Sequence, residues 1–133
     1  MLKEMNHVGI AVRNLSSSKE LFQRLFGLAV HHEEAVVSQK VNTATFRVGS
    51  TFIELLEGTS PDSSVSRFVE KRGEGIHHLS FVVENIEQEL KRLKESGFRL
   101  VDEKPLPGAN NCLVAFLHPK STNGVLIEIS QRL

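Results

Sequence analysis

Hydrophobic and polar positions follow the same pattern twice along the chain. Residues 7–15 resemble residues 78–86 position by position, and each segment reads as an apolar strand closed by a polar pair that ends in asparagine. An amphipathic stretch follows each strand, over residues 16–26 and 87–96, with apolar residues at helical spacing. Both stretches stop at a glycine followed by an apolar residue, which is a common way to end a helix. The pattern therefore predicts two copies of one strand–helix unit.

The remainder of each copy predicts further strands. Residues 41–48 and 113–117 have the apolar and β-branched content of strands, and turn residues follow each of them. A second apolar run closes each copy, over residues 52–56 and 126–130. Each copy is therefore a β-α-β-β-β module.

The two modules are expected to pack together, because each is too small to bury much apolar surface alone. We predict an α+β fold in which tandem modules form one domain over residues 1–133. Module one covers residues 1–58, a linking helix covers residues 61–72, and module two covers residues 75–133.

Strand alternation separates the chemistry-bearing residues from the core-forming ones. Successive strand residues point to opposite faces of a sheet, so His7 and His78 turn away from the apolar face that packs against the helices. Each histidine shares its face with a small residue two positions later, which leaves room for a cavity. Glu54 and Glu128 likewise lie opposite apolar neighbours within the last strand of their module.

These histidines and glutamates together predict a metal site. A carboxylate in an apolar strand is unfavourable unless it faces water or is paired, protonated or coordinated. Taken singly, each residue fits a packed or surface position, but the same pair recurs at equivalent places in both modules. A pseudo-twofold pairing would bring His7, Glu54, His78 and Glu128 to one centre. Two imidazoles and two carboxylates suit a divalent ion such as Co, Ni, Zn or Mn and leave positions open for a substrate.

The sequence around the other histidines and the cysteine predicts structural roles for them. His77 has the opposite strand parity to its neighbour and should point away from the cavity, whereas His118 opens a turn. His31 and His32 lie beside two glutamates at a solvated strand end, and Cys112 reads as a packing residue. The sequence has no glycine-rich phosphate loop and no Gly-x-Ser-x-Gly elbow, which argues against P-loop and serine-hydrolase chemistry.

Composition and charge narrow the classes of partner. Sixteen basic residues balance sixteen acidic ones without a basic cluster, so we expect no nucleic-acid partner. A run of about 18 apolar residues, which a membrane span needs, does not occur, so we expect no membrane partner. The single cysteine cannot form an internal disulfide and suits a reducing compartment, so we expect a cytoplasmic protein.

The duplicated module with one histidine and one glutamate per copy resembles the vicinal oxygen chelate superfamily, which includes glyoxalases, bleomycin resistance proteins and dioxygenases. The resemblance covers essentially the whole chain, and within the superfamily the sequence looks like the methylmalonyl-CoA epimerases. The segments that carry this likeness are residues 6–12, 52–57, 60–63, 72–78 and 116–128.

The resemblance implies a metal-dependent isomerase with His7, Glu54, His78 and Glu128 as ligands. The implied reaction interconverts the C2 epimers of methylmalonyl-CoA by moving the α-proton through a metal-stabilised enolate. Inversion of the centre needs a base on one face and an acid on the other, and the family likeness makes Glu128 one of that catalytic pair. The implied partners are a small-molecule CoA thioester and, by analogy, a second copy of the chain in a homodimer.

The sequence departs from the epimerase pattern at two places. Some family members have a glutamate on the strand aligned with Thr43, and threonine cannot take up a proton at neutral pH. Glu54, Lys40 or a metal-bound water are the alternatives for the second acid–base group. The loop of residues 107–111, which is expected to shape the substrate pocket, has Asn110 where related epimerases often show histidine or glycine.

Two other functions fit the same fold. A glyoxalase I of the lactoylglutathione lyase type uses the same four ligands on a glutathione hemithioacetal, while a non-enzymatic small-molecule-binding protein needs no such ligands. An extradiol dioxygenase would use two histidines and one carboxylate, so the fourth ligand, Glu54, argues against it. The segments around the linking helix and residues 118–124 favour the epimerase.

Overall fold

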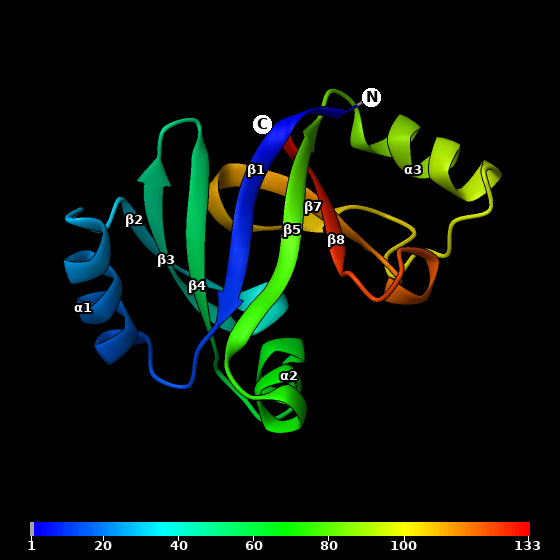
Figure 1. Cartoon of the computed structure of the whole chain (residues 1–133). Helices are drawn as coiled ribbons and strands as arrows, with labels where there is room; N and C mark the ends of the chain where they lie inside the picture. The colour runs from blue at the N-terminus through cyan, green and yellow to red at the C-terminus, as the bar shows by residue number, and fades with distance from the viewer. Residues whose placement is uncertain (1) are drawn as a thin grey trace. The chain divides into compact units, whose positions relative to one another are not determined.

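The computed structural model describes residues 2–133, and its elements follow the predicted order (Figure 1). The α+β class and the two β-α-β-β-β modules are confirmed by the strands and helices of each copy. Short 3-10 turns lie at Val37–Gln39, Ala109–Asn111 and Pro119–Ser121. The elements are β1 (Leu2–Ala11), α1 (Leu15–Phe26), β2 (His32–Val36), β3 (Val41–Val48), β4 (Thr51–Gly58), α2 (Ser64–Arg72), β5 (Gly75–Val83), α3 (Ile86–Glu95), β6 (Leu106–Pro107), β7 (Cys112–Leu117) and β8 (Ile127–Arg132).

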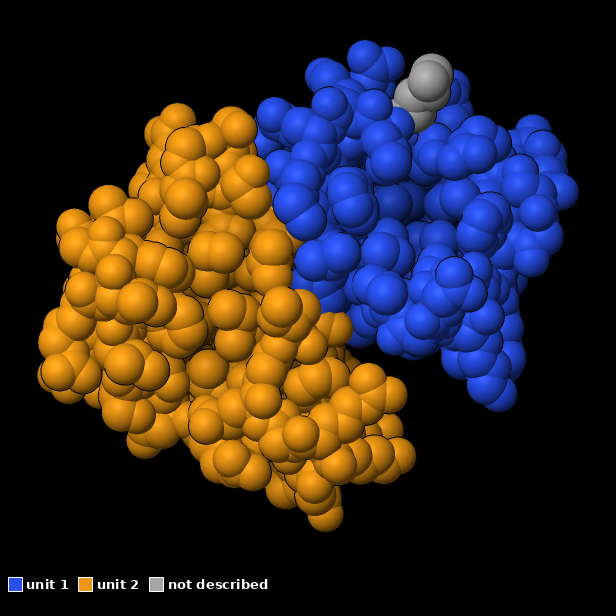
Figure 2. All heavy atoms as spheres, in the orientation of Figure 1, with its two compact units in different colours: residues 1–6, 78–133 blue, residues 7–77 orange. Residues whose placement is uncertain are grey.

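The chain divides into two compact units (Figure 2). Unit 2 holds residues 7–77, and unit 1 holds residues 78–133 together with the first residues of β1. In unit 2 the strand order is β2-β3-β4-β1, and in unit 1 it is β6-β7-β8-β5. The last pair of each order is parallel and the others are antiparallel, so the two units repeat one topology. The single domain over residues 1–133 stays a prediction.

The asparagine that recurs in both copies begins a helix. The Asn14 side chain accepts a hydrogen bond from the Ser17 backbone N–H at the start of α1. Asn85 accepts in the same way from Gln88 at the start of α3. Asparagine at this position satisfies a backbone donor that the helix itself leaves without a partner. The repeated asparagine is therefore structural, and it fixes where each module turns from strand to helix.

The apolar face of each module packs as the alternation predicts. In unit 2, Val12, Phe46 and Leu55 form a buried cluster that Phe22 and Phe26 of α1 cover. In unit 1 the cluster centres on α3 and the strands beneath it: Val83, Ile86, Leu90, Leu93, Ala115, Leu117 and Ile129. Residues of opposite parity, among them the two candidate glutamates, are therefore directed to the other face of each sheet.

Several element boundaries differ from the expectation: β5 begins at Gly75, three residues early, β4 and β8 each end two residues late, and the starts of β1 and α2 differ for identifiable reasons. Strand β1 begins at Leu2, five residues before the apolar run, because its first residues are exposed and carry no hydrophobic signal. Helix α2 begins at Ser64 and not at residue 61, because residues 61 and 62 form a turn and Ser63 caps the helix by accepting from the Ser66 N–H. Among the helices of residues 2–133, none has the length and apolar content to cross a membrane.

Candidate metal centre

The first candidate pair lies on neighbouring strands of unit 2. His7 comes from β1 and Glu54 from β4, which run parallel and place Gly9 directly beside Glu54. The His7 Nε2 atom is 3.7 Å from the Glu54 Oε2 atom, and both side chains are buried. Glycine at position 9 leaves the imidazole and the carboxylate free of a bulky neighbour on that strand.

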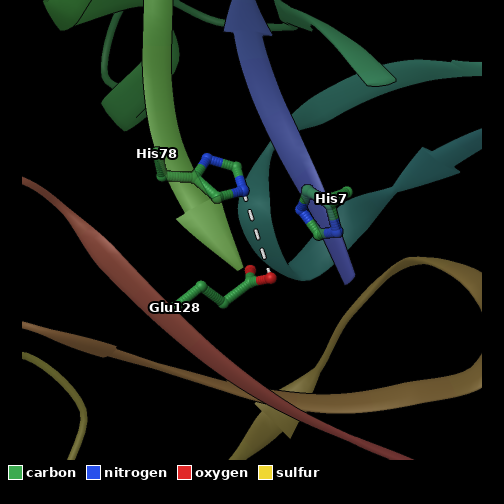
Figure 3. Close-up of side chains that lie close together, drawn as sticks. All are labelled: His7, His78 and Glu128. Atoms are coloured by element: carbon green, nitrogen blue, oxygen red, sulfur yellow. Dashed lines mark ion pairs between the residues drawn. The ribbon is translucent and has the colours of Figure 1, made fainter. Parts of the chain in front are cut away.

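The second candidate pair repeats this arrangement in unit 1. His78 comes from β5 and Glu128 from β8, which are also parallel, with Ser80 directly beside Glu128. The His78 Nε2 atom is 4.0 Å from the Glu128 Oε1 atom, along the dashed line in Figure 3. All four side chains of the two pairs belong to residues that are between 3% and 7% exposed, so the alternative that the glutamates face water is wrong.

Burial sets the protonation of these groups. Desolvation lowers the pKa of His7 to about 4, so its imidazole is neutral at pH 7 and has a nitrogen lone pair to offer. Desolvation raises the pKa of Glu128 to about 7, a shift that the Ser80 hydroxyl opposes and the Asp102 charge supports. A neutral imidazole and a carboxyl that ionises near neutral pH are both competent metal ligands.

Three of the four residues offer donor atoms at one place. Ligand atoms of His7, His78 and Glu128 lie within 4.8 Å of one another, and Figure 3 shows the three side chains directed toward each other. Two imidazole nitrogens and a carboxylate oxygen form a donor set that fits a borderline divalent ion. Glu54 is not part of this group, although it lies 3.7 Å from His7, and its role as fourth ligand stays a prediction.

The histidine next to the second pair points elsewhere, as its parity predicts. The His77 ring packs edge-on against Phe68 of α2, with ring centroids 5.0 Å apart. The His78 ring instead meets Phe116 of β7 edge-on at 5.4 Å. Phe116 lies directly opposite Glu128 on β7, so an aromatic ring covers one side of the second pair.

The remaining singled-out residues have the structural roles that were expected. The His118 Nδ1 atom accepts from the Lys120 backbone N–H and caps a 3-10 turn. His32 is exposed and lies 2.9 Å from Glu34. Cys112 is buried, and its thiol contacts the Asn110 backbone carbonyl oxygen at 3.5 Å.

The alternatives for the second acid–base group are reduced by two contacts. The buried Thr43 hydroxyl donates to the Glu34 backbone carbonyl oxygen at 3.2 Å, so it serves the link between β2 and β3. The Lys40 ammonium binds Asp62, and this contact lowers the pKa of the Asp62 carboxyl to about 2. Both side chains are about half exposed, which places Lys40 at the surface and in an ion pair.

The loop of residues 107–111 departs from the epimerase pattern at Asn110, and the backbone conformation there explains the asparagine. Asn110 has φ 57° and ψ 37°, and Asn111 has φ 55°, so both backbones are left-handed. Glycine and asparagine are the residues that adopt this conformation most readily. Asparagine at position 110 thus meets the same backbone demand that a glycine would.

Sequence reasoning missed two buried hydroxyls beside the candidate ligands. Thr45 lies directly opposite Glu54 on β3, and Ser80 lies directly opposite Glu128 on β5. Both residues are completely buried. Strand alternation indicates that Ser80 shares the face of His78, but no local signal indicates that its hydroxyl meets Glu128 across a ladder.

The chain is similar to known proteins over almost its whole length. The family model of the Glyoxalase/Bleomycin resistance protein/Dioxygenase superfamily matches residues 6–116. The chain is 38% identical to the uncharacterized protein YqjC of Bacillus subtilis (strain 168), over 98% of this chain and 93% of that protein. It is 37% identical to the mitochondrial methylmalonyl-CoA epimerase of Dictyostelium discoideum, over 97% of this chain and 78% of that protein.

A solved structure matches over nearly the whole fold. It is a substituted form of the Streptomyces coelicolor methylmalonyl-CoA epimerase in complex with 2-nitronate-propionyl-CoA. The match has a TM-score of 0.96 and 30% sequence identity, and it covers 99% of this chain and 96% of that chain.

Proposed function

Since the chain belongs to the Glyoxalase/Bleomycin resistance protein/Dioxygenase superfamily, we propose that it is an isomerase that interconverts the C2 epimers of methylmalonyl-CoA. Relatives that carry this activity in their names match almost the entire chain. The observation that supports the proposal most is the buried group of His7, His78 and Glu128, whose donor atoms lie within 4.8 Å of one another. A binding protein without catalytic function has no need to bury such a group.

The proposed ligands are His7, Glu54, His78 and Glu128, for an ion such as Co, Ni, Zn or Mn. Their burial would strengthen the attraction between these donors and the ion, because charges interact more strongly away from water. A divalent ion held there supplies positive charge that makes the α-proton of a nearby thioester more acidic. The chain's own residues must then accept this proton on one face of the carbon and return it on the other.

Glu128 is the proposed acid–base group on one face. Its buried carboxylate belongs to the donor group, so the α-carbon of a substrate bound at the ion would lie within its reach. The Phe116 ring, which meets the His78 ring edge-on and lies opposite Glu128, and the neighbouring strands shield this carboxyl from water.

For the other face, two of the three alternatives are left: Glu54 and a metal-bound water. Thr43 has no basic group, and Lys40 is held at the surface by Asp62. Glu54 is the remaining side chain among the alternatives that the chain itself supplies, and it is buried beside His7. The proposed homodimer and the cytoplasmic location rest on family likeness and on the single cysteine.

The proposal is tested by deuterium wash-in at the substrate α-carbon. Protein reloaded with cobalt is incubated in D₂O with methylmalonyl-CoA and, separately, with the hemithioacetal of methylglyoxal and glutathione. We expect rapid label uptake into methylmalonyl-CoA, together with conversion of a single C2 epimer into a mixture of both epimers. Turnover of the hemithioacetal alone would replace the proposal with glyoxalase chemistry, and turnover of neither would refute an isomerase of this type.

A further inference from the structure

Each candidate glutamate faces a buried hydroxyl on a neighbouring strand. Thr45 is directly opposite Glu54 across the β3–β4 ladder, and Ser80 is directly opposite Glu128 across the β5–β8 ladder. Residues opposite each other in a ladder direct their side chains to the same face of the sheet, and in an antiparallel pair such as β3–β4 their Cβ atoms lie about 4.5–5.5 Å apart. Each hydroxyl therefore shares one buried face with one carboxylate.

Neither hydroxyl has a hydrogen bond of regular geometry within the described chain. Thr45 and Ser80 are both 0% exposed, and the Thr45 Oγ1 and Ser80 Oγ atoms have no such bond among residues 2–133. The Ser80 hydroxyl nevertheless acts on Glu128, since it opposes the rise in the pKa of that carboxyl. Buried side-chain hydroxyls in native proteins almost always form a hydrogen bond, so two hydroxyls without a regular one, each opposite a candidate ligand, require an explanation. Other buried hydroxyls nearby do have partners. Thr43, also on β3, donates to the Glu34 backbone carbonyl oxygen, and Ser130 on β8 donates to the Phe81 backbone carbonyl oxygen.

We propose that Thr45 and Ser80 are positioning residues, whose hydroxyls donate to Glu54 and Glu128 when these carboxylates turn to hold the ion. A carboxylate that gives one lone pair to a metal has others left to accept hydrogen bonds. A donor on the opposite strand then fixes the carboxylate orientation and compensates part of its lost hydration. This inference rests on the proposed function, since it requires that the two glutamates be metal ligands.

The two units supply this donor from different sides of the glutamate. In unit 2 the hydroxyl comes from the antiparallel neighbour β3, and the parallel neighbour carries Gly9 at the matching place. In unit 1 the hydroxyl comes from the parallel neighbour β5, and the antiparallel neighbour carries Phe116. Each glutamate thus faces one hydroxyl, and the strand that supplies it differs.

Metal affinity of the whole protein tests the inference without reference to any substrate. Co²⁺ dissociation constants are measured by competition with a chelator, with the visible absorption band of bound cobalt as the signal. Ser80→Ala and Thr45→Val should each weaken Co²⁺ binding by about 10–100-fold, the usual effect of removing a partner of a ligand. Thr45→Ser keeps the hydroxyl and should restore most of the affinity.

Matched controls separate positioning from a general structural role. Ser130→Ala and Thr43→Val remove buried hydroxyls on the same sheets, but these hydroxyls already donate to backbone carbonyls. In chelator-treated protein the controls should lower the melting temperature, because each loses a hydrogen bond, while Co²⁺ affinity stays at the wild-type value. Ser80→Ala and Thr45→Val should show the reverse, with affinity lost and the melting temperature of the chelator-treated protein maintained.

The outcomes that overturn the inference are distinct from those that overturn the proposed function. Wild-type Co²⁺ affinity in Ser80→Ala or Thr45→Val refutes the positioning role for that residue. A melting temperature that falls in these variants as it does in the controls shows a structural hydroxyl and refutes it as well. A wild-type protein that takes up no Co²⁺ refutes the metal site of the proposed function, and the positioning role with it.

Discussion

The two units repeat one topology and one histidine–glutamate pair, yet they surround the two glutamates differently. Glu54 of unit 2 lies between Gly9 and Thr45, whereas Glu128 of unit 1 lies between Ser80 and Phe116. An aromatic ring thus lies on one side of Glu128, and burial raises the pKa of that carboxyl to about 7. A duplicated module can therefore keep the same donors while the residues around each carboxylate differ.

The helices of the two units differ as well. Helix α3 of unit 1 buries Ile86, Leu90 and Leu93 against its sheet. Helix α1 of unit 2 has no buried residue, and Leu21 and Leu25 are 52% and 68% exposed. The same strand–helix design thus gives a closed apolar contact in one unit and a partial one in the other.

The largest expected effect separates the two glutamates. Glu128→Gln should retain some metal but lose epimerisation by more than about 10²–10⁴-fold, because the basic group is removed and coordination is weakened. Glu54→Gln should keep metal and lose less activity, since glutamine retains an oxygen donor. Metal content and deuterium wash-in are compared at equal metal loading. An inactive Glu54→Gln beside an active Glu128→Gln would reverse the assigned roles.

The next largest effect is expected at the two histidines. Wild-type protein should take up about one Co²⁺ ion per chain. His7→Ala and His78→Ala should each abolish this uptake, because both imidazoles belong to the same donor group. Elemental analysis after gel filtration measures the uptake. His77→Ala is the matched control, because its ring packs on Phe68 and should not bind the ion. Undiminished uptake in either ligand variant would contradict the assignment.

A smaller effect is expected in the free energy of unfolding when a leucine is shortened in α3 or in α1. Leu90→Ala in α3 should lower the free energy of unfolding by about 2–5 kcal/mol, because it leaves a cavity in a buried cluster. Leu25→Ala in α1 should change that free energy by no more than about 0.5 kcal/mol, because the side chain is largely exposed. Urea unfolding followed by circular dichroism measures both. A large loss at Leu25 would show that the exposed face of α1 is covered in solution.

The smallest effect is expected at Cys112. Cys112→Ser replaces a buried packing residue outside the donor group, so turnover should be nearly unchanged and the stability loss at most about 1–3 kcal/mol. Steady-state rates and urea midpoints check the two parts. A normally folded variant without activity would identify a catalytic thiol and contradict the packing role.

Strand alternation and helical spacing predicted most of the fold, because each module has one clearly apolar face. Helices α1 and α3 begin within a residue of the expected positions, since an asparagine cap precedes each. The polar beginning of β1 and the two-residue strand β6 lacked such a signal. Their positions depend on pairing with partners distant in the sequence, which a local pattern does not contain.

Strand alternation predicted part of the candidate site, but not the contacts between distant residues. Parity alone separated His78 from His77, and the structure directs these rings to Phe116 and Phe68, respectively. The ion pair of Lys40 with Asp62 could not be predicted, because it joins residues 22 positions apart through a turn. The same holds for the hydroxyls opposite Glu54 and Glu128, which depend on which residues meet across a ladder.

The placement of each glutamate between apolar neighbours also affects folding itself. In β4 and β8, Glu54 and Glu128 are flanked by residues of the core face, among them Ile53 and Ile129. A slip of either strand by one residue would move the carboxylate into the apolar core and expose its neighbours. Burying an uncompensated carboxylate is strongly unfavourable, so a misaligned chain is destabilised at once. Each glutamate therefore disfavours a misaligned register of its strand, and this effect is independent of any reaction.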